Sequence, residues 1–319
     1  MRPFRFWGNA DPTGGSDLAT VVANARRAEA AGFAGLVWPD HLVGLHATLP
    51  LLTAVVATTE RLRVMPFVLN SGLRHPAVAA QELATIDVLS GGRLDVAVGG
   101  GWNKPEYDAI GIPFPAPGVR VDILTETIDI LEGCFAEGPF SYAGTHFRIT
   151  DYDAGPRPAQ RPRPPLCIGG GGKRMLTLAG RRADIVGLAP RTITGRDGRI
   201  ASEPYSFTFA GTEEKIGWIR DAAGERFADL ELNIYPSGGP LVITDDPEPE
   251  ARKYVDRARE AAGVELSVQD VLDSPHVYVG PLPFLVDKLT KLRERLGISS
   301  FMLGGVEPAT PLVRALAGK

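Results

Sequence analysis

The chain has 319 residues, of which 44% are hydrophobic and 23% charged, and a formal net charge of -4. This is ordinary globular usage, which excludes a disordered or fibrous chain. The slightly acidic balance gives no basic surface for nucleic acid or an anionic membrane, so composition favours a small molecule as partner.

The two cysteines, Cys134 and Cys167, have no CxxC spacing and no histidine cluster around them. They predict two buried thiols, with no disulfide, zinc site or other metal site. The N-terminus lacks the apolar stretch of a signal peptide, and no segment approaches the roughly 20 apolar residues that span a bilayer. We therefore expect a cytoplasmic protein with no membrane partner.

The first third of the chain alternates short apolar runs with helical patterns. The runs are too continuous for one-sided strands, which indicates strands buried on both faces of a parallel sheet. Their starts lie about one βα unit apart. The predicted strands are 4–7, 34–38, 62–69 and 94–98, and the predicted helices are 16–31, 50–59 and 76–89.

After a predicted helix at 119–135 the period breaks. Residues 140–149 predict a hairpin turning at Ala143 and Gly144, and the stretch that follows is too proline-rich for helix or central strand. We interpret 136–165 as an excursion and not as a domain boundary. The remaining predictions are strands at 166–168, 184–188, 230–235 and 299–303, a helix at 173–182, a weakly patterned second excursion at 190–228, and partial helix within 245–274.

Eight strands separated by helices favour an α/β (β/α)8 TIM barrel with insertions, formed by residues 1–319 as a single domain. Reactive groups in such barrels come from the carboxyl ends of the strands. The candidates there are Asn9, Asp40, His41, Asn70, Ser71, Gly99, Gly100, Gly101, Trp102, Gly169, Gly170, Gly171 and Gly172.

Gly169, Gly170, Gly171 and Gly172 form a run after the fifth strand that is the strongest phosphate signal in the chain. Glycine lets backbone N–H groups approach an anion, and the following helix offers its positive end, with charge added by Lys173. The alternative is a flexible turn without a ligand. The spacing matches neither the dinucleotide motif nor the P-loop.

Gly99, Gly100 and Gly101 form a second glycine turn, where backbone could lie against a flat ring, or which could be only a tight turn. Asp40 and His41 follow a buried strand and could hold and titrate a ring nitrogen or carbonyl, although such a pair can also be a capping arrangement. No Ser-His-Asp elbow and no paired carboxylates stand at these strand ends, which speaks against a hydrolase.

Three stretches give the chain a resemblance to a known family. They are RRAEAAGFAGLVWPDH, HPAVAAQELATIDVLSGGRLDVAVGGGW, and PFSYAGTHF followed by PRPPLCIGGGGKRMLTLAGRRADIVGL. With them the chain resembles the luciferase-like monooxygenase superfamily, and within it the actinobacterial coenzyme F420-dependent (deazaflavin) oxidoreductases. The similarity extends from about residue 20 to residue 190.

The resemblance implies a (β/α)8 barrel with a flavin or deazaflavin ring across its mouth. It implies a non-proline cis peptide behind the ring, near Pro66, Phe67 and Val68. It matches Asp40 with a ring contact and makes His41 a candidate proton donor or acceptor. The two glycine turns match the segments beside the ring and around the cofactor phosphate, and homodimers are common among such proteins.

Trp102 stands where the sugar-phosphate dehydrogenases of this superfamily carry a catalytic glutamate. The resemblance therefore implies that glucose 6-phosphate is not the substrate. An aromatic wall including Trp102 and Phe67 suits a hydrophobic or conjugated molecule better.

The leading prediction is an oxidoreductase that transfers a hydride between coenzyme F420 and an organic substrate, with His41 handling a proton. One alternative is an FMN-dependent monooxygenase that uses reduced flavin and oxygen. Another is a barrel that binds the cofactor without catalysis.

Overall fold

Eight apolar segments form strands at the places that the sequence predicts, with the third segment divided in two. The computed structural model describes residues 1–195, 200–237 and 239–319. These strands are β1 (Arg5–Asn9), β2 (Gly35–Trp38), β3 (Arg63–Pro66) with β4 (Leu69–Asn70), β5 (Val96–Gly99), β8 (Leu166–Gly170), β9 (Ile185–Leu188), β12 (Glu231–Ile234) and β15 (Ile298–Gly304).

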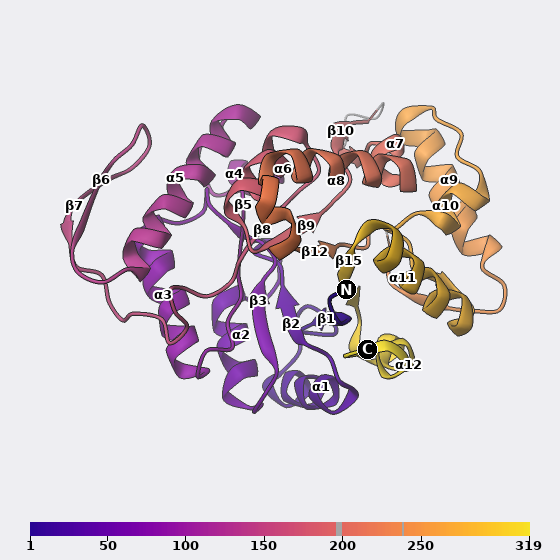
Figure 1. Cartoon of the computed structure of the whole chain (residues 1–319), viewed down its shortest axis with the longest axis horizontal. Helices are drawn as coiled ribbons and strands as arrows, with labels where there is room; N and C mark the ends of the chain where they lie inside the picture. The colour runs from indigo at the N-terminus through magenta and orange to yellow at the C-terminus, as the bar shows by residue number, and fades with distance from the viewer. Residues whose placement is uncertain (196–199, 238) are drawn as a thin grey trace. The chain divides into compact units, whose positions relative to one another are not determined.

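Helices follow the strands along the chain, as Figure 1 shows. Pro76 is the first residue of α3, where the lack of a backbone N–H costs no hydrogen bond within the helix. Just before it, His75 Nδ1 accepts the Ala77 N–H at 3.2 Å. The helices are α1 (Leu18–Ala31), α2 (Thr48–Ala57), α3 (Pro76–Leu89), α4 (Lys104–Ala109), α5 (Pro117–Phe135), α6 (Lys173–Arg182), α7 (Pro204–Phe207), α8 (Phe209–Ala223), α9 (Glu248–Ala262), α10 (Val268–Asp273), α11 (Leu282–Leu296) and α12 (Val306–Leu316), with a 3-10 turn at Gly224–Asp229.

The described chain divides into two compact units, so the single domain over 1–319 stays a prediction. The first unit comprises residues 1–9, 27–35 and 168–319, and the second comprises residues 10–26 and 36–167. The pairs β1–β15, β12–β15 and β9–β12 in the first unit, and β4–β5 in the second, are parallel.

In the first unit the strand order is β1-β15-β12-β9. Inside it, Ser300 Oγ accepts from the indole N–H of Trp7 at 3.1 Å and from Asn233 Nδ2 at 2.8 Å. Helices α6 and α8 pack side by side. Helix α8 lies within the predicted excursion at 190–228, so part of that segment is a regular helix that the sequence pattern did not show.

In the second unit, β4 pairs with β5 so that Leu69 faces Val98 and Asn70 faces Gly99. Helices α3 and α5 pack together. The predicted hairpin is confirmed as β6 (Phe140–Ala143) and β7 (Arg148–Tyr152), an antiparallel pair that projects beside α5 in Figure 1.

Two further pairs of short strands belong to the first unit. There β10 (Thr192–Thr194) pairs with β11 (Ile200–Ser202), and β13 (Val242–Ile243) pairs with β14 (Val279–Gly280). Cys134 and Cys167 are buried thiols, as predicted, and burial raises the pKa of Cys134 to about 11.

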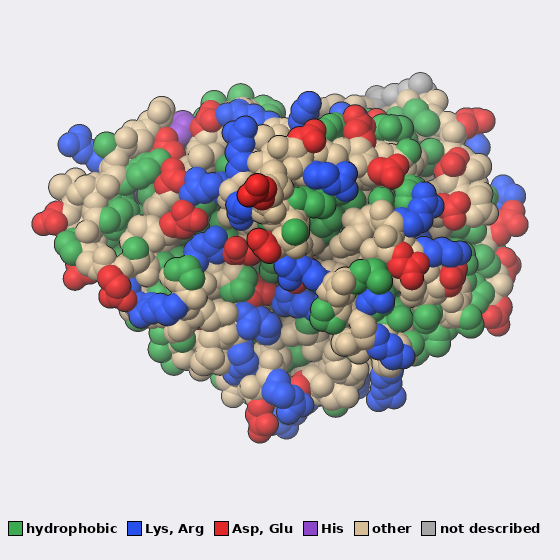
Figure 2. All heavy atoms as spheres, viewed as in Figure 1, with side chains coloured by type: hydrophobic (Ala, Val, Ile, Leu, Met, Phe, Trp, Pro, Cys, Tyr) green, Lys and Arg blue, Asp and Glu red, His purple; other side chains and the backbone are tan. Residues whose placement is uncertain are grey.

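Acidic and basic side chains are interspersed over the face in Figure 2, in keeping with totals of 38 and 34 residues. Within the described residues, no helix has the length and apolar character that a membrane crossing requires.

Candidate functional site

Asp40 directly follows β2 and is a buried carboxylate with both oxygens engaged. Arg74 donates to Oδ2 at 2.7 Å and to Oδ1 at 3.1 Å, and the backbone N–H of Asn70 donates to Oδ2 at 2.9 Å. A bidentate guanidinium contact of this kind fixes both partners in one orientation. Asp40 therefore anchors the end of β4 and the loop that follows it.

His41 pairs with a buried carboxylate that the sequence reading missed. Its Nδ1 lies 2.7 Å from Oε1 of Glu106, whose side chain is 1% exposed, whereas that of His41 is 24% exposed. In the neutral imidazole, Nδ1–H must be the donor because a carboxylate only accepts. Nε2 is then the atom left to exchange a proton, and it makes no hydrogen bond within the described part of the chain.

Helix α4 brings Glu106 to this position. Asn103, just before the helix, donates its side-chain N–H to Glu106 Oε1, while Glu106 Oε2 is buried and has no partner among the described residues. The sequence signal was the N-x-x-E spacing of Asn103 and Glu106, typical of a helix start. It was missed because Glu106 lies 65 residues from His41 along the chain.

Asn70 is the centre of a second buried network. Its Oδ1 accepts from the hydroxyl of Tyr107 at 2.7 Å and from the N–H of Gly72 at 3.0 Å. Burial raises the pKa of Tyr107, so its hydroxyl stays a donor. The ring of Trp102 meets His41 edge-on at 5.6 Å, and Trp102 is 51% exposed. The structure thus brings Trp102 to His41 and leaves it an open face.

The peptide between Phe67 and Val68 is cis, at the place that the family resemblance implies. It joins β3, which ends at Pro66, to β4. A Cβ on Gly99 would lie 2.5 Å from Cγ2 of Val68, so only glycine lets β5 pass this side chain. A Cβ on Gly100 would lie 3.4 Å from the Arg120 carbonyl oxygen, which is an ordinary contact, so packing does not require glycine there.

Replacing Gly101 with alanine is expected to lower the free energy of unfolding by about 2 kcal/mol. Gly101 has a φ of +72°, and a Cβ there would lie 2.6 Å from the Tyr107 hydroxyl and 2.7 Å from Asn70 Oδ1. Urea unfolding measures the change. Gly91→Ala is the matched control, because Gly91 has a φ of +66° but nothing within 4 Å. Equal losses in both variants would show that the Asn70 network does not require this glycine.

Gly169, Gly170, Gly171 and Gly172 lie in the first unit, at the turn from β8 into α6. A Cβ on Gly171 would lie 2.4 Å from the carbonyl oxygen of Pro190, and one on Gly170 would lie 2.4 Å from Cγ of Met175. Close packing inside the unit therefore explains two of the four glycines.

Gly172 instead has open space where a Cβ would stand, and it precedes the first turn of α6. Lys173 begins that helix, with its Nζ 5.9 Å from the centre of the Trp218 ring. Binding of a phosphate by this turn stays a prediction.

A cavity of about 150 Å³ in the second unit brings the predicted candidates Ser71 and Gly100 together with Arg120, which the sequence did not indicate. Ser71 Oγ is buried there with no partner in the described chain. Arg120 donates to the Pro115 oxygen at 2.7 Å and lies over Phe114, and burial lowers its pKa. Within the described part of the chain no carboxylate lines the cavity, which therefore suits an anionic group. Its lining residues are Ser71, Gly72, Gly100, Tyr107, Pro113, Pro115, Arg120 and Ile123.

Known proteins resemble this chain over most of its length. The profile of the family described as "Luciferase-like monooxygenase" matches residues 3–269. The "FMNH(2)-dependent dimethylsulfone monooxygenase" of Pseudomonas putida is 38% identical over 139 residues, which are 44% of this chain and 38% of that protein. The "F420-dependent glucose-6-phosphate dehydrogenase" of Microbacterium testaceum is 33% identical over 217 residues, which are 66% of this chain and 62% of that protein. Both alignments span less than two thirds of the relative.

Among solved structures, the coenzyme F420-dependent tetrahydromethanopterin reductase of Methanopyrus kandleri matches with a TM-score of 0.74. The match covers 98% of this chain and 97% of that one at 21% identity. At this identity the match shows the fold, and it confirms the predicted (β/α)8 barrel.

Proposed function

Because the chain belongs to the luciferase-like monooxygenase family, we propose that it is an oxidoreductase that transfers a hydride between coenzyme F420 and an organic small molecule. Its relatives include enzymes named as F420-dependent and as FMNH(2)-dependent. The preference for F420 is supported by the F420-dependent relative, which aligns with the larger share of this chain, 66% against 44%.

The observation that carries the proposal is the pairing of His41 with buried Glu106. Reduction of a carbonyl or oxidation of an alcohol moves a proton as well as a hydride, and a positioned histidine is the side chain best suited to move it near neutral pH. Glu106 holds the imidazole by Nδ1 and so fixes its orientation. Nε2 of His41 is then directed to the substrate oxygen.

The loop after β5 is held in one conformation by close packing. A Cβ on Gly99 would collide with Val68, and one on Gly101 would collide with Tyr107 and Asn70, so these glycines let the loop pack tightly beside the cis peptide. We propose that Asp40, Pro66, Phe67, Val68, Asn70, Gly99, Gly100, Gly101 and Trp102 hold the ring of the cofactor. When bound, coenzyme F420 would supply the hydride chemistry, and the protein supplies position and the proton.

The anionic part of the cofactor has two candidate sites. One is the turn formed by Gly169, Gly170, Gly171, Gly172 and Lys173, and the other is the cavity beside Arg120 and Ser71. The half-buried Arg120 side chain and the Ser71 hydroxyl, which has no partner among the described residues, support the second site. The open position at Gly172 before α6 supports the first. Loss of cofactor affinity in Lys173→Gln or in Arg120→Gln distinguishes them.

An FMN-dependent monooxygenase is the second candidate, supported by the 38% identity to the FMNH(2)-dependent relative over 139 residues. For the substrate we propose a hydrophobic or conjugated molecule and not glucose 6-phosphate, because Trp102 replaces the expected glutamate with an exposed aromatic face. A cytoplasmic location and a homodimer are further parts of the proposal.

Titration of the purified protein with each cofactor tests the choice between them. We expect coenzyme F420 to bind and its absorption band near 420 nm to change on binding. FMN, followed by its own absorption band near 450 nm, should bind at least about tenfold more weakly. Isothermal titration calorimetry gives the two dissociation constants independently. Tight binding of FMN with no affinity for coenzyme F420 would overturn the F420 assignment and favour the monooxygenase.

A further inference from the structure

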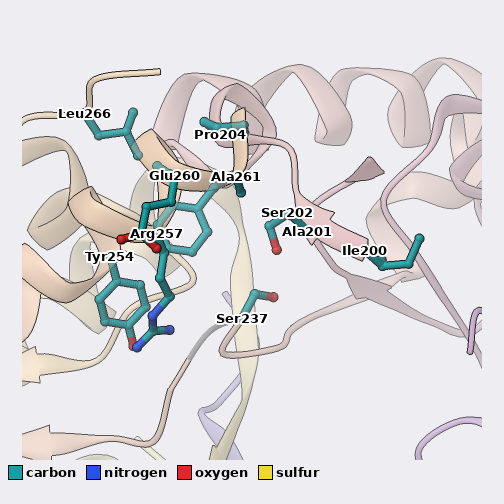
Figure 3. A pocket seen from close by; sticks show the side chains of 12 residues that line it. Ile200, Ala201, Ser202, Pro204, Ser237, Tyr254, Arg257, Glu260, Ala261 and Leu266 are labelled. Atoms are coloured by element: carbon teal, nitrogen blue, oxygen red, sulfur yellow. The ribbon is translucent and has the colours of Figure 1, made fainter. Parts of the chain in front are cut away.

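A larger cavity lies in the first unit, among residues to which neither the sequence motifs nor the proposed redox chemistry give a role. Its volume is about 480 Å³, within the range of pockets that hold small organic ligands. Strand β11, helices α7 and α9, and residues Ser237 and Leu266 surround it, as Figure 3 shows. We call it the Phe207 cavity.

One wall of the Phe207 cavity is a stack of aromatic rings. Phe207 lies between Tyr254, with ring centres 6.0 Å apart and planes at 28°, and His276, with centres 5.9 Å apart and planes at 18°. All three residues are buried. Phe207 and Tyr254 both line the cavity, so this buried stack gives the cavity a rigid apolar wall.

Hydrogen bonds behind the wall hold it in place. The buried ammonium of Lys215 donates to the Ser206 oxygen at 2.7 Å and the Ala189 oxygen at 2.9 Å, and lies 3.3 Å from His276 Nε2. His276 Nδ1 lies 2.8 Å from the Tyr235 oxygen, so the histidine is held from both nitrogens. The wall is therefore organised without a ligand, which lowers the entropy cost of binding one.

Ser274 fixes Phe207 from the other side. Its Oγ donates to the Phe207 carbonyl oxygen at 2.5 Å. The remaining apolar surface of the cavity comes from side chains of moderate size, which leave its centre open. They are Ile200, Ala201, Pro204, Ala258, Ala261 and Leu266.

The polar groups at the cavity are mostly hydrogen-bond donors. Tyr254 and Arg257 extend from α9 with their polar ends adjacent, and the guanidinium lies 4.9 Å from the centre of the Tyr254 ring. The Tyr254 hydroxyl makes no hydrogen bond with any described residue, and Ser202 and Ser237 add hydroxyls from the opposite side (Figure 3). Among the residues that the structure describes, Glu260 is the one acidic residue that lines the cavity.

We propose that the Phe207 cavity binds a small apolar carboxylate, with its body among the apolar side chains that line the cavity and its carboxylate at Arg257. The apolar lining suits a hydrocarbon body, and the guanidinium with the hydroxyl donors matches an acceptor-only group. Glu260 lies one helical turn from Arg257 and disfavours a second negative charge on the ligand, which makes a monocarboxylate the best match. The proposal does not depend on the cofactor or on the redox activity.

Calorimetric titration of the full chain with 2-naphthoate, and with neutral 2-naphthamide for comparison, tests this proposal. We expect 2-naphthoate to bind at one site, and Ala261→Trp, which fills the cavity, to weaken that binding at least about tenfold. Arg257→Gln should weaken 2-naphthoate about threefold to fivefold and leave 2-naphthamide unchanged. Arg252→Gln is the matched control, because Arg252 is on the same helix but pairs with Glu248 outside the cavity.

Ser202→Phe fills the cavity from the opposite wall and replaces Ala261→Trp if that variant does not fold. The proposal is overturned if 2-naphthoate does not bind the unaltered protein, or if filling the cavity leaves its affinity unchanged. Equal effects of Arg257→Gln on the acid and the amide would equally overturn the assigned carboxylate.

Discussion

Replacing His41 with alanine is expected to lower kcat at least about a hundredfold while the dissociation constant for coenzyme F420 changes less than about twofold. The imidazole is proposed to move the proton that accompanies the hydride, whereas the ring of the cofactor rests mainly on backbone and on other side chains. The rate is followed at the F420 absorption band with the best substrate from a panel of apolar aldehydes, ketones and conjugated carbonyl compounds.

Glu106→Gln tests the same pair with a milder change. The amide oxygen still accepts from Nδ1 but is a weaker acceptor than the carboxylate, so the imidazole is held less firmly and kcat should fall about tenfold, less than in His41→Ala. Unchanged turnover in His41→Ala, with cofactor binding intact, would remove His41 from the chemistry. A loss of cofactor affinity without a loss of kcat would make it a binding residue.

Replacing Asp40 with alanine is expected to lower the free energy of unfolding by about 3 kcal/mol. The change leaves the guanidinium of Arg74, which is 25% exposed, without its bidentate partner, and the Asn70 N–H without its acceptor. Urea unfolding measures the loss. Adding Arg74→Met should recover part of it, because no uncompensated charge then remains.

Asp108→Ala is the control for Asp40→Ala. Asp108 pairs with Lys104 on α4, but the two side chains are 56% and 60% exposed, so this loss should stay below about 0.5 kcal/mol. If Asp40→Ala costs no more than this control, Asp40 does not anchor the loop after β4. Its carboxylate would then be available to the cofactor alone.

The contrast between α3 and α8 shows where sequence pattern carries the fold and where it does not. Helix α3 begins at the predicted residue because Pro76 both permits a first helical turn and resists a later one. Helix α8 was missed because its buried face includes Lys215, which periodicity counts as a surface residue. That lysine can be buried because the carbonyl oxygens of Ala189 and Ser206 accept hydrogen bonds from its Nζ.

The same reasoning separates the found site residues from the missed ones. Asp40 and His41 could be predicted because they stand directly after a buried strand, where a parallel barrel collects its functional groups. Glu106, Arg74 and Arg120 could not, because each matters through a partner or a cavity that the chain order does not reveal. Spacing along the chain determines local structure, whereas pairing depends on how the segments pack.

The sequence by itself determined the alternation of buried strands and helices, the family, and the positions of the strand-end residues, because these depend on local periodicity and short motifs. Only the tertiary structure decided that Glu106 pairs with His41, that Arg74 neutralises Asp40, and that Phe207, Tyr254 and His276 form one wall. These contacts join residues far apart in the chain, and burial gives them their strength by removing the competing water.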